Sequence, residues 1–178
     1  MPSGDFNLIV TSPKNMEFAA ASEIEAALRD LGDPEPKAWP STVKGVIFVR
    51  TNLSREEVIS GLREMARERP FNLVNVKRVI PVDLVVETEL ERIAEAAGSL
   101  AGRIAEGETY RVTVEKRHTE LHSMDVIRAV AAKFERRVDL KNPDKVVLVE
   151  IVGPVTAIAV IKPDEVLSVE KEWQSSGE

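Results

Sequence analysis

The sequence predicts an α+β protein made of two compact domains, and three observations support this prediction. Apolar residues make up 43% and charged residues 30% of the 178 residues, a balance typical of a folded globular chain. In the first half, short β-branched runs and amphipathic helices follow one another in the order β-α-β-β-α-β. The second half predicts a helix, a strand, a further helix and two strands joined by a tight turn.

The N-terminal domain, residues 1–86, begins with a short apolar strand over 7–11. A helix over 16–31 follows, and a period of about 3.6 residues places its apolar side chains on one face. These apolar residues are Phe18, Ala21, Ile24, Leu28 and Leu31. A short strand at 37–39 and a β-branched strand at 44–51 come next.

A capping box formed by Ser54 and Glu57 is expected to open the second helix of this domain. Pro70 follows that helix, and residues 74–86 read as one strand that bends at Pro81. The resulting β-α-β-β-α-β order is typical of the ferredoxin-like, or split βαβ, fold.

The second domain, residues 87–170, opens with a helix that the pair Thr88 and Glu91 would cap. The segment 109–116 alternates strictly between apolar and polar residues, which predicts a strand. A helix over 124–137 is expected to follow it.

Two β-branched strands, 146–151 and 155–161, are separated by only a short turn, which predicts a hairpin. The strand over 109–116, the helix after it and the strand 146–151 predict a parallel βαβ unit. The polar residues 171–178 are expected to form a flexible tail.

Several classes of protein are disfavoured by composition. The chain contains no cysteine, which excludes disulfides, thiol nucleophiles and Cys-ligated metal sites. Its glycines form neither a dinucleotide-binding nor a Walker-type loop, so we expect no cofactor and a protein that is not an enzyme. Because no apolar stretch is long enough to span a membrane and the N-terminus lacks a signal-peptide pattern, we expect a cytoplasmic protein.

The net charge of −6 argues against a nucleic-acid binder, but the charge is unevenly distributed. Residues 1–107 and residues 164–178 each carry a net charge of −4. Residues 108–163 carry a net charge of +2, so the acidity lies outside the predicted βαβ unit.

Basic and polar residues gather within the βαβ unit, and we expect them to line one groove that contacts phosphates. The candidates are Lys116, Arg117, His118, Lys133, Arg136, Arg137, Lys141, Asn142 and Lys145. Arg117 is the best single candidate, because a planar guanidinium suits phosphate. The alternative is that these groups only make the surface soluble. Aromatic residues are scarce, so RNA recognition would depend on backbone and shape more than on stacked bases.

Three segments of the second domain resemble the THUMP domain. They are Tyr110–Glu120 (YRVTVEKRHTE), Val138–Gly153 (VDLKNPDKVVLVEIVG) and Thr156–Ile161 (TAIAVI). The most specific parts are the Lys-Arg step after the strand and the V-D-L-x-N-P-D turn. The ferredoxin-like order of the N-terminal domain also matches this family, and the chain most resembles its tRNA acetylation adaptors.

The resemblance implies that residues 87–170 form a THUMP domain that binds the acceptor stem and 3′ end of tRNA together with the N-terminal domain. It further implies a non-catalytic adaptor, which presents tRNA to a separate acetyltransferase that forms N4-acetylcytidine in the D-arm. The expected partners are therefore tRNA and that acetyltransferase, and neither DNA nor a membrane is expected.

Two other functions are compatible with the sequence. An RNA-binding adaptor could serve the methylation or thiolation of tRNA instead of its acetylation. A ferredoxin-like module could instead bind a small ligand, or form dimers by pairing its edge strands.

Overall fold

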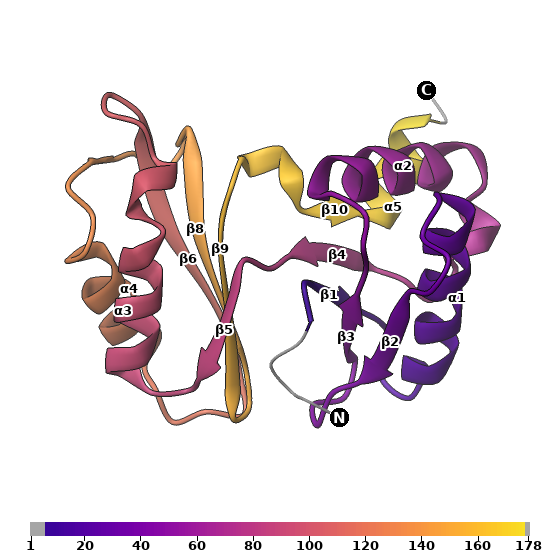
Figure 1. Cartoon of the computed structure of the whole chain (residues 1–178), viewed down its shortest axis with the longest axis horizontal. Helices are drawn as coiled ribbons and strands as arrows, with labels where there is room; N and C mark the ends of the chain where they lie inside the picture. Colours follow the sequence, from indigo (N-terminus) through magenta and orange to yellow (C-terminus); the bar gives the residue numbers. More distant parts are fainter. Residues whose placement is uncertain (1–5, 177–178) are drawn as a thin grey trace. The chain divides into compact units, whose positions relative to one another are not determined.

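The computed structural model describes residues 6–176 and divides them into two compact units. The first unit contains residues 6–81 together with residues 164–176, and the second unit contains Val82–Pro163. Each unit consists of one five-stranded sheet and the helices packed on it (Figure 1). The predicted α+β fold class is therefore confirmed.

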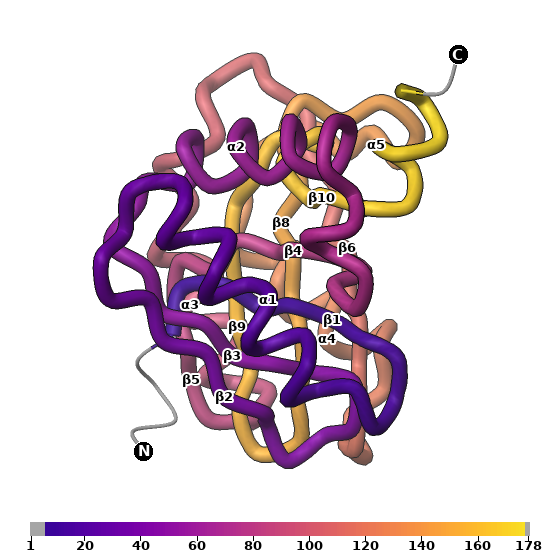
Figure 2. Tube along the Cα trace, turned by 90° about the vertical axis from the view of Figure 1, so that its right-hand side faces the viewer, coloured from indigo at the N-terminus to yellow at the C-terminus, as the bar shows by residue number. Residues whose placement is uncertain are grey.

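The first unit has the predicted β-α-β-β-α-β order. Its elements are β1 (Leu8–Thr11), α1 (Glu17–Asp30), β2 (Lys37–Pro40), β3 (Val46–Arg50), α2 (Arg55–Glu68) and β4 (Arg78–Pro81). Together with β10 (Leu167–Ser168), the strands lie in the order β10-β4-β1-β3-β2, and every neighbouring pair is antiparallel. Helices α1 and α2 lie in front of these strands in Figure 2, and their apolar faces bury Leu8, Val10, Ile47 and Val49.

Local sequence signals explain the ends of these helices. The predicted capping box is present, because the Ser54 side chain accepts a hydrogen bond from the Glu57 amide while Glu57 accepts one from the Ser54 amide. Phe18 departs from the prediction: its side chain is 79% exposed instead of lying on the buried face of α1. Position 18 falls on the flank of the helix, outside the stripe that contains Ala21, Ile24 and Leu28.

The segment 74–86, expected as one bent strand, forms two strands in different sheets. A short 3-10 helix, η1 (Pro70–Leu73), precedes β4, and β5 (Leu84–Glu87) belongs to the sheet of the second unit. Asp83 explains the transfer, because its amide donates to the Ile158 carbonyl and its carboxylate accepts from the Val160 amide at 2.9 Å. The chain therefore leaves the first sheet at Pro81 and enters the second sheet at once.

Residues 164–176 return to the first unit and 171–176 are helical, whereas Gly177 and Glu178 of the tail expected over 171–178 lie outside the described residues. After η3 (Pro163–Glu165), β10 (Leu167–Ser168) pairs with β4, and α5 (Val169–Ser176) packs on α2. Glu172 of α5 holds this contact through ion pairs with Arg63 at 3.0 Å and Arg67 at 2.8 Å. Leu167 is fully buried in the core of the first unit.

The second unit contains the predicted βαβ unit and hairpin. After β5, its elements are α3 (Leu90–Ser99), η2 (Ala101–Arg103), β6 (Thr109–Arg117), α4 (Ser123–Ala131), β7 (Arg137–Val138), β8 (Lys145–Val152) and β9 (Val155–Ile161). The sheet order is β5-β9-β8-β6-β7, with β6 parallel to β8 and β8 antiparallel to β9. Helices α3 and α4 cover one face of this sheet (Figure 1).

Two helix boundaries differ from the prediction. Helix α4 ends at Ala131, because Lys133 and Phe134 form tighter i→i+3 hydrogen bonds that turn the Phe134 ring onto Tyr110, with the ring centres 5.3 Å apart. Thr88 does not cap α3. Its hydroxyl instead donates to the Gly153 carbonyl at 2.8 Å, and α3 begins after Glu89.

Candidate nucleic-acid interface

The nine predicted site residues form two groups at opposite ends of β6. The carboxyl-end group contains Lys116, Arg117 and His118, and the amino-end group contains Lys133, Arg136, Arg137, Lys141, Asn142 and Lys145. Arg137 and Lys145 lie beside Thr109 and Tyr110 at the start of β6, whereas Arg117 lies at its end. A strand rises about 3.3 Å per residue, so about 23 Å separate Tyr110 from Arg117. The structure therefore does not bring the two groups into one groove.

Two of the three side chains of the carboxyl-end group bind other parts of the protein. The Arg117 guanidinium forms an ion pair with Glu150, with 3.1 Å between Nη2 and Oε1, and the exposed fractions of the two side chains are 19% and 1%. The Nζ atom of Lys116 donates to the Leu121 carbonyl at 3.1 Å. His118 is exposed and takes a left-handed backbone conformation (φ 55°) where the chain turns out of β6.

Two members of the amino-end group are also bound internally. Arg136 donates to the carbonyls of Ile104, Ala105 and Glu135, so it fastens the loop before β6. Lys145 donates to Glu108 at 2.9 Å, and this hydrogen bond together with one from the Ala105 amide lowers the pKa of Glu108.

The remaining amino-end residues present exposed side chains. Lys133, Arg137, Lys141 and Asn142 are exposed, and within residues 6–176 their side chains have no hydrogen bond or ion pair. Asp139 fixes the loop that carries two of them, because its carboxylate accepts hydrogen bonds from the amides of Lys141 and Asn142. We call Lys133, Arg137, Lys141 and Asn142 the amino-end patch.

Apolar side chains accompany the amino-end patch. Val138 of β7 is 52% exposed, and Leu140 in the loop that follows β7 is 71% exposed. The backbone of this loop is held in place by Arg111, whose Nη1 atom donates to the Leu140 carbonyl at 3.1 Å. Arg111 was not among the predicted residues, because its position in an alternating strand hides its contact with a loop that is distant in sequence.

The chemistry of the amino-end patch suits an anionic polymer. Three cations, Lys133 just after α4, Arg137 in β7 and Lys141 in the loop after it, can donate charge-assisted hydrogen bonds to phosphates without first breaking internal ion pairs. Lys133 is further placed by its aliphatic stem, which lies against Gly98 of α3. Among residues 6–176 there is no cluster of three or more potential metal ligands of the His, Cys, Asp or Glu type. The helices in this range are all too short or too polar to cross a membrane.

Residues 87–160 match the family model of the THUMP domain. This match lies within the second unit and includes the whole βαβ unit together with the amino-end patch. The chain therefore contains a THUMP domain, as its sequence motifs predict. A THUMP domain implies RNA binding in tRNA modification.

Particular proteins share this sequence or fold. The uncharacterized protein MJ0421 of Methanocaldococcus jannaschii is 28% identical over 144 residues, which cover 78% of this chain and 37% of that protein. The crystal structure of PH1313 from Pyrococcus horikoshii has a TM-score of 0.64 at 22% identity, covering 88% of this chain and 55% of that one. A 4-thiouridine synthetase solved with RNA and ATP has a TM-score of 0.54 at 13% identity, covering 92% of this chain and 42% of that one. This chain thus spans between 37% and 55% of the length of these proteins.

Proposed function

We propose that this chain is a non-catalytic, tRNA-binding adaptor that presents tRNA to a separate acetyltransferase, which forms N4-acetylcytidine in the D-arm. The THUMP domain over residues 87–160 is the observation that carries this proposal. The amino-end patch supports it, because its exposed cations offer direct contacts to the phosphates of a folded RNA. The motifs that resemble the tRNA acetylation adaptors support the choice of acetylation.

The roles of the ionisable groups with shifted pKa values also fit a binding protein. Asp33 and Glu108 hold backbone amides through hydrogen bonds, and Tyr110 is buried beside Phe134, where burial raises its pKa. Each of these shifts thus accompanies a structural contact. In this proposal the acetyl donor and the catalytic groups belong to the partner protein.

A second candidate function is an adaptor for tRNA thiolation or methylation. The similarity to a 4-thiouridine synthetase solved with RNA supports this candidate. It shares the RNA-binding step with the first proposal and differs in the catalytic partner.

Mapping of modified nucleotides in tRNA from a strain that lacks this gene tests both candidates. Loss of N4-acetylcytidine from the D-arm, restored by the wild-type gene, is the expected result. Loss of a thiolated or methylated nucleotide with acetylation intact would favour the second candidate. A modification profile identical to that of the parent strain would contradict both.

A further inference from the structure

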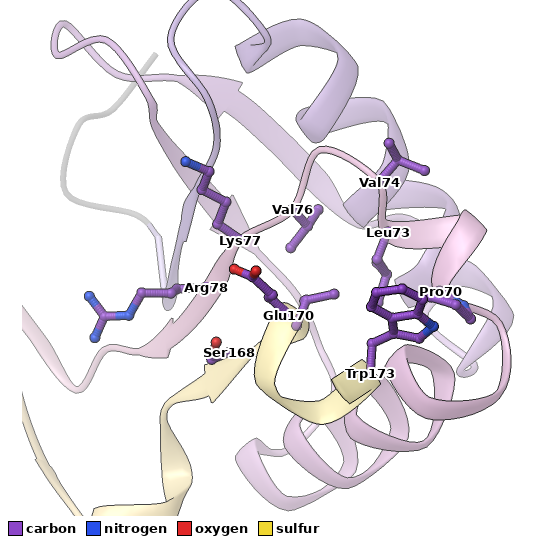
Figure 3. A pocket seen from close by; sticks show the side chains of 10 residues that line it. Pro70, Leu73, Val74, Val76, Lys77, Arg78, Ser168, Glu170 and Trp173 are labelled. Carbon is purple, nitrogen blue, oxygen red and sulfur yellow. The ribbon is translucent and has the colours of Figure 1, made fainter. Parts of the chain in front are cut away.

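The first unit contains a hollow that lies outside the THUMP match and outside the amino-end patch. Its volume is about 470 Å³, within the range of small-ligand sites in proteins. The hollow lies between η1, the start of β4 and the first turns of α5 (Figure 3). Pro70, Leu73 and Trp173 contribute apolar surface to it, whereas Lys77, Arg78 and Glu170 contribute charged groups.

Trp173 gives this hollow a flat aromatic wall. The indole lies beside Pro70 and Leu73 in Figure 3, yet the residue is 55% exposed. Its helix is held in place because the neighbouring Glu172 forms ion pairs with both Arg63 and Arg67 of α2. The indole is therefore positioned by the fold while much of its surface remains available to a ligand.

Two consecutive cations line the same hollow. Hydrogen bonds of the Lys77 backbone fix this segment. The Lys77 amide donates to the Thr11 carbonyl, and the Lys77 carbonyl accepts from the Val169 amide. Within residues 6–176, neither the Lys77 nor the Arg78 side chain has a hydrogen bond or an ion pair. Figure 3 shows Trp173 on the other side of the hollow from these two side chains. In Figure 3 these two cations extend away from the indole, and the Glu170 carboxylate lies between them and Trp173.

We propose that this hollow binds an unpaired nucleotide of RNA, whose base stacks on Trp173 while an adjoining phosphate contacts Lys77 and Arg78. Stacking on an aromatic side chain combined with cationic contacts to the backbone is the general chemistry of single-stranded RNA binding. The paired cations favour this ligand over an uncharged one. The inference rests on the proposed function, since it assumes that RNA is the ligand of the chain.

The charge of Glu170 allows the charge of the ligand to be tested. Its side chain also points into the hollow, so its negative charge opposes a phosphate held by Lys77 and Arg78. Glu170→Gln should therefore bind single-stranded RNA more tightly than the parent protein does. A positively charged ligand would instead bind Glu170→Gln more weakly than it binds the parent protein.

Tryptophan fluorescence provides a direct test. The chain has two tryptophans, so Trp39→Phe leaves Trp173 as the single reporter. In this background, single-stranded tetraadenylate should quench the fluorescence saturably, whereas a blunt RNA hairpin and inorganic phosphate alone should not. Lys77→Ala combined with Arg78→Ala should weaken the binding of tetraadenylate at least fivefold. Lys171→Ala, which removes a neighbouring cation on α5 that does not line the hollow, is the matched control.

Three outcomes would overturn the inference. The first is that tetraadenylate does not quench the fluorescence of Trp173. The second is that the double variant and the parent protein bind tetraadenylate with equal affinity. The third is that an acidic leucine-containing peptide quenches more strongly than tetraadenylate does, which would indicate a protein ligand. Circular dichroism melts establish that each variant is folded. If tRNA still binds the full chain while tetraadenylate does not quench Trp173, this inference fails alone; if tRNA does not bind, the proposed function fails.

Discussion

Arg117 at the end of β6 and Glu150 in β8 form an ion pair whose carboxylate is 1% exposed. The Nη1 atom of Arg117 is also buried, and it has no hydrogen-bond partner in the part of the chain that the structure describes. The residue that the sequence singles out as the best phosphate contact is thus engaged by the protein. This geometry indicates that Arg117 contributes to the stability of the βαβ unit.

Arg117→Ala should lower the free energy of unfolding by about 3 kcal/mol, because it removes an ion-pair partner from a buried carboxylate. Urea denaturation at neutral pH measures this change. Arg92→Ala is the control, since Arg92 is 57% exposed in its ion pair with Glu89 and should contribute little. A similar small effect of both substitutions would contradict the structural role of Arg117.

Arg137→Ala combined with Lys141→Ala should weaken tRNA binding without unfolding the protein. The side chains of both residues are exposed and free of internal partners among residues 6–176. Removal of each cation that binds a phosphate should reduce the slope of log affinity against log salt by about 1. Titration of tRNA at several salt concentrations gives this slope, and Arg92→Ala again serves as the control. An unchanged slope would exclude these side chains from the interface.

Asp33→Asn should destabilise the protein at pH 7 by about 2 kcal/mol, because the ionised carboxylate accepts hydrogen bonds from the Thr51 hydroxyl and from the amides of Asn52 and Glu35. Burial alone would raise the pKa of Asp33, but these hydrogen bonds outweigh burial and lower it. Asp33 therefore stabilises the fold above the unfolded pKa of about 3.9, and this contribution is lost as the pH falls through the lower folded pKa.

The difference in free energy of unfolding between Asp33→Asn and the parent protein should thus become smaller as the pH is lowered from 7 to 3. Urea denaturation at both pH values measures it. Asp30→Asn is a suitable control, because Asp30 makes an exposed ion pair with Arg69. A difference that is independent of pH would show that the charge of Asp33 does not contribute.

Leu167→Ala should cost about 3 kcal/mol of stability, because Leu167 is fully buried in the core of the first unit. Leu140→Ala is its control, since Leu140 is 71% exposed and should change stability by less than about 0.5 kcal/mol. Chemical denaturation compares the two variants. Equal stability would show that β10 does not contribute to the core.

Local patterns predict most of the fold. The capping box at Ser54 and the alternation along β6 depend only on nearby residues, and both are present as predicted. The transfer between the sheets at Asp83 could not be predicted, because it depends on hydrogen bonds to Ile158 and Val160, which are distant in sequence. The same limitation hid α5, whose polar sequence is stabilised by ion pairs with α2.

The candidate site was predicted less well than the fold, for a topological reason. Lys116 lies at the end of β6, whereas Lys141 precedes β8. Because β6 and β8 are parallel, the end of one strand and a segment before the other lie at opposite ends of the sheet. Composition alone grouped these residues together. The buried partner of Arg117 lies in another strand and was equally hidden from a reading of local sequence.

The pairing of Leu167 with Val79 has a consequence for synthesis on the ribosome. The whole second unit emerges between β4 and β10, so it can complete its core while the first unit still lacks its last strand and helix. Until then, β4 remains an edge strand with unpaired backbone groups, which is a surface that a chaperone can recognise. The unit whose residues are translated first is therefore the unit that finishes folding last.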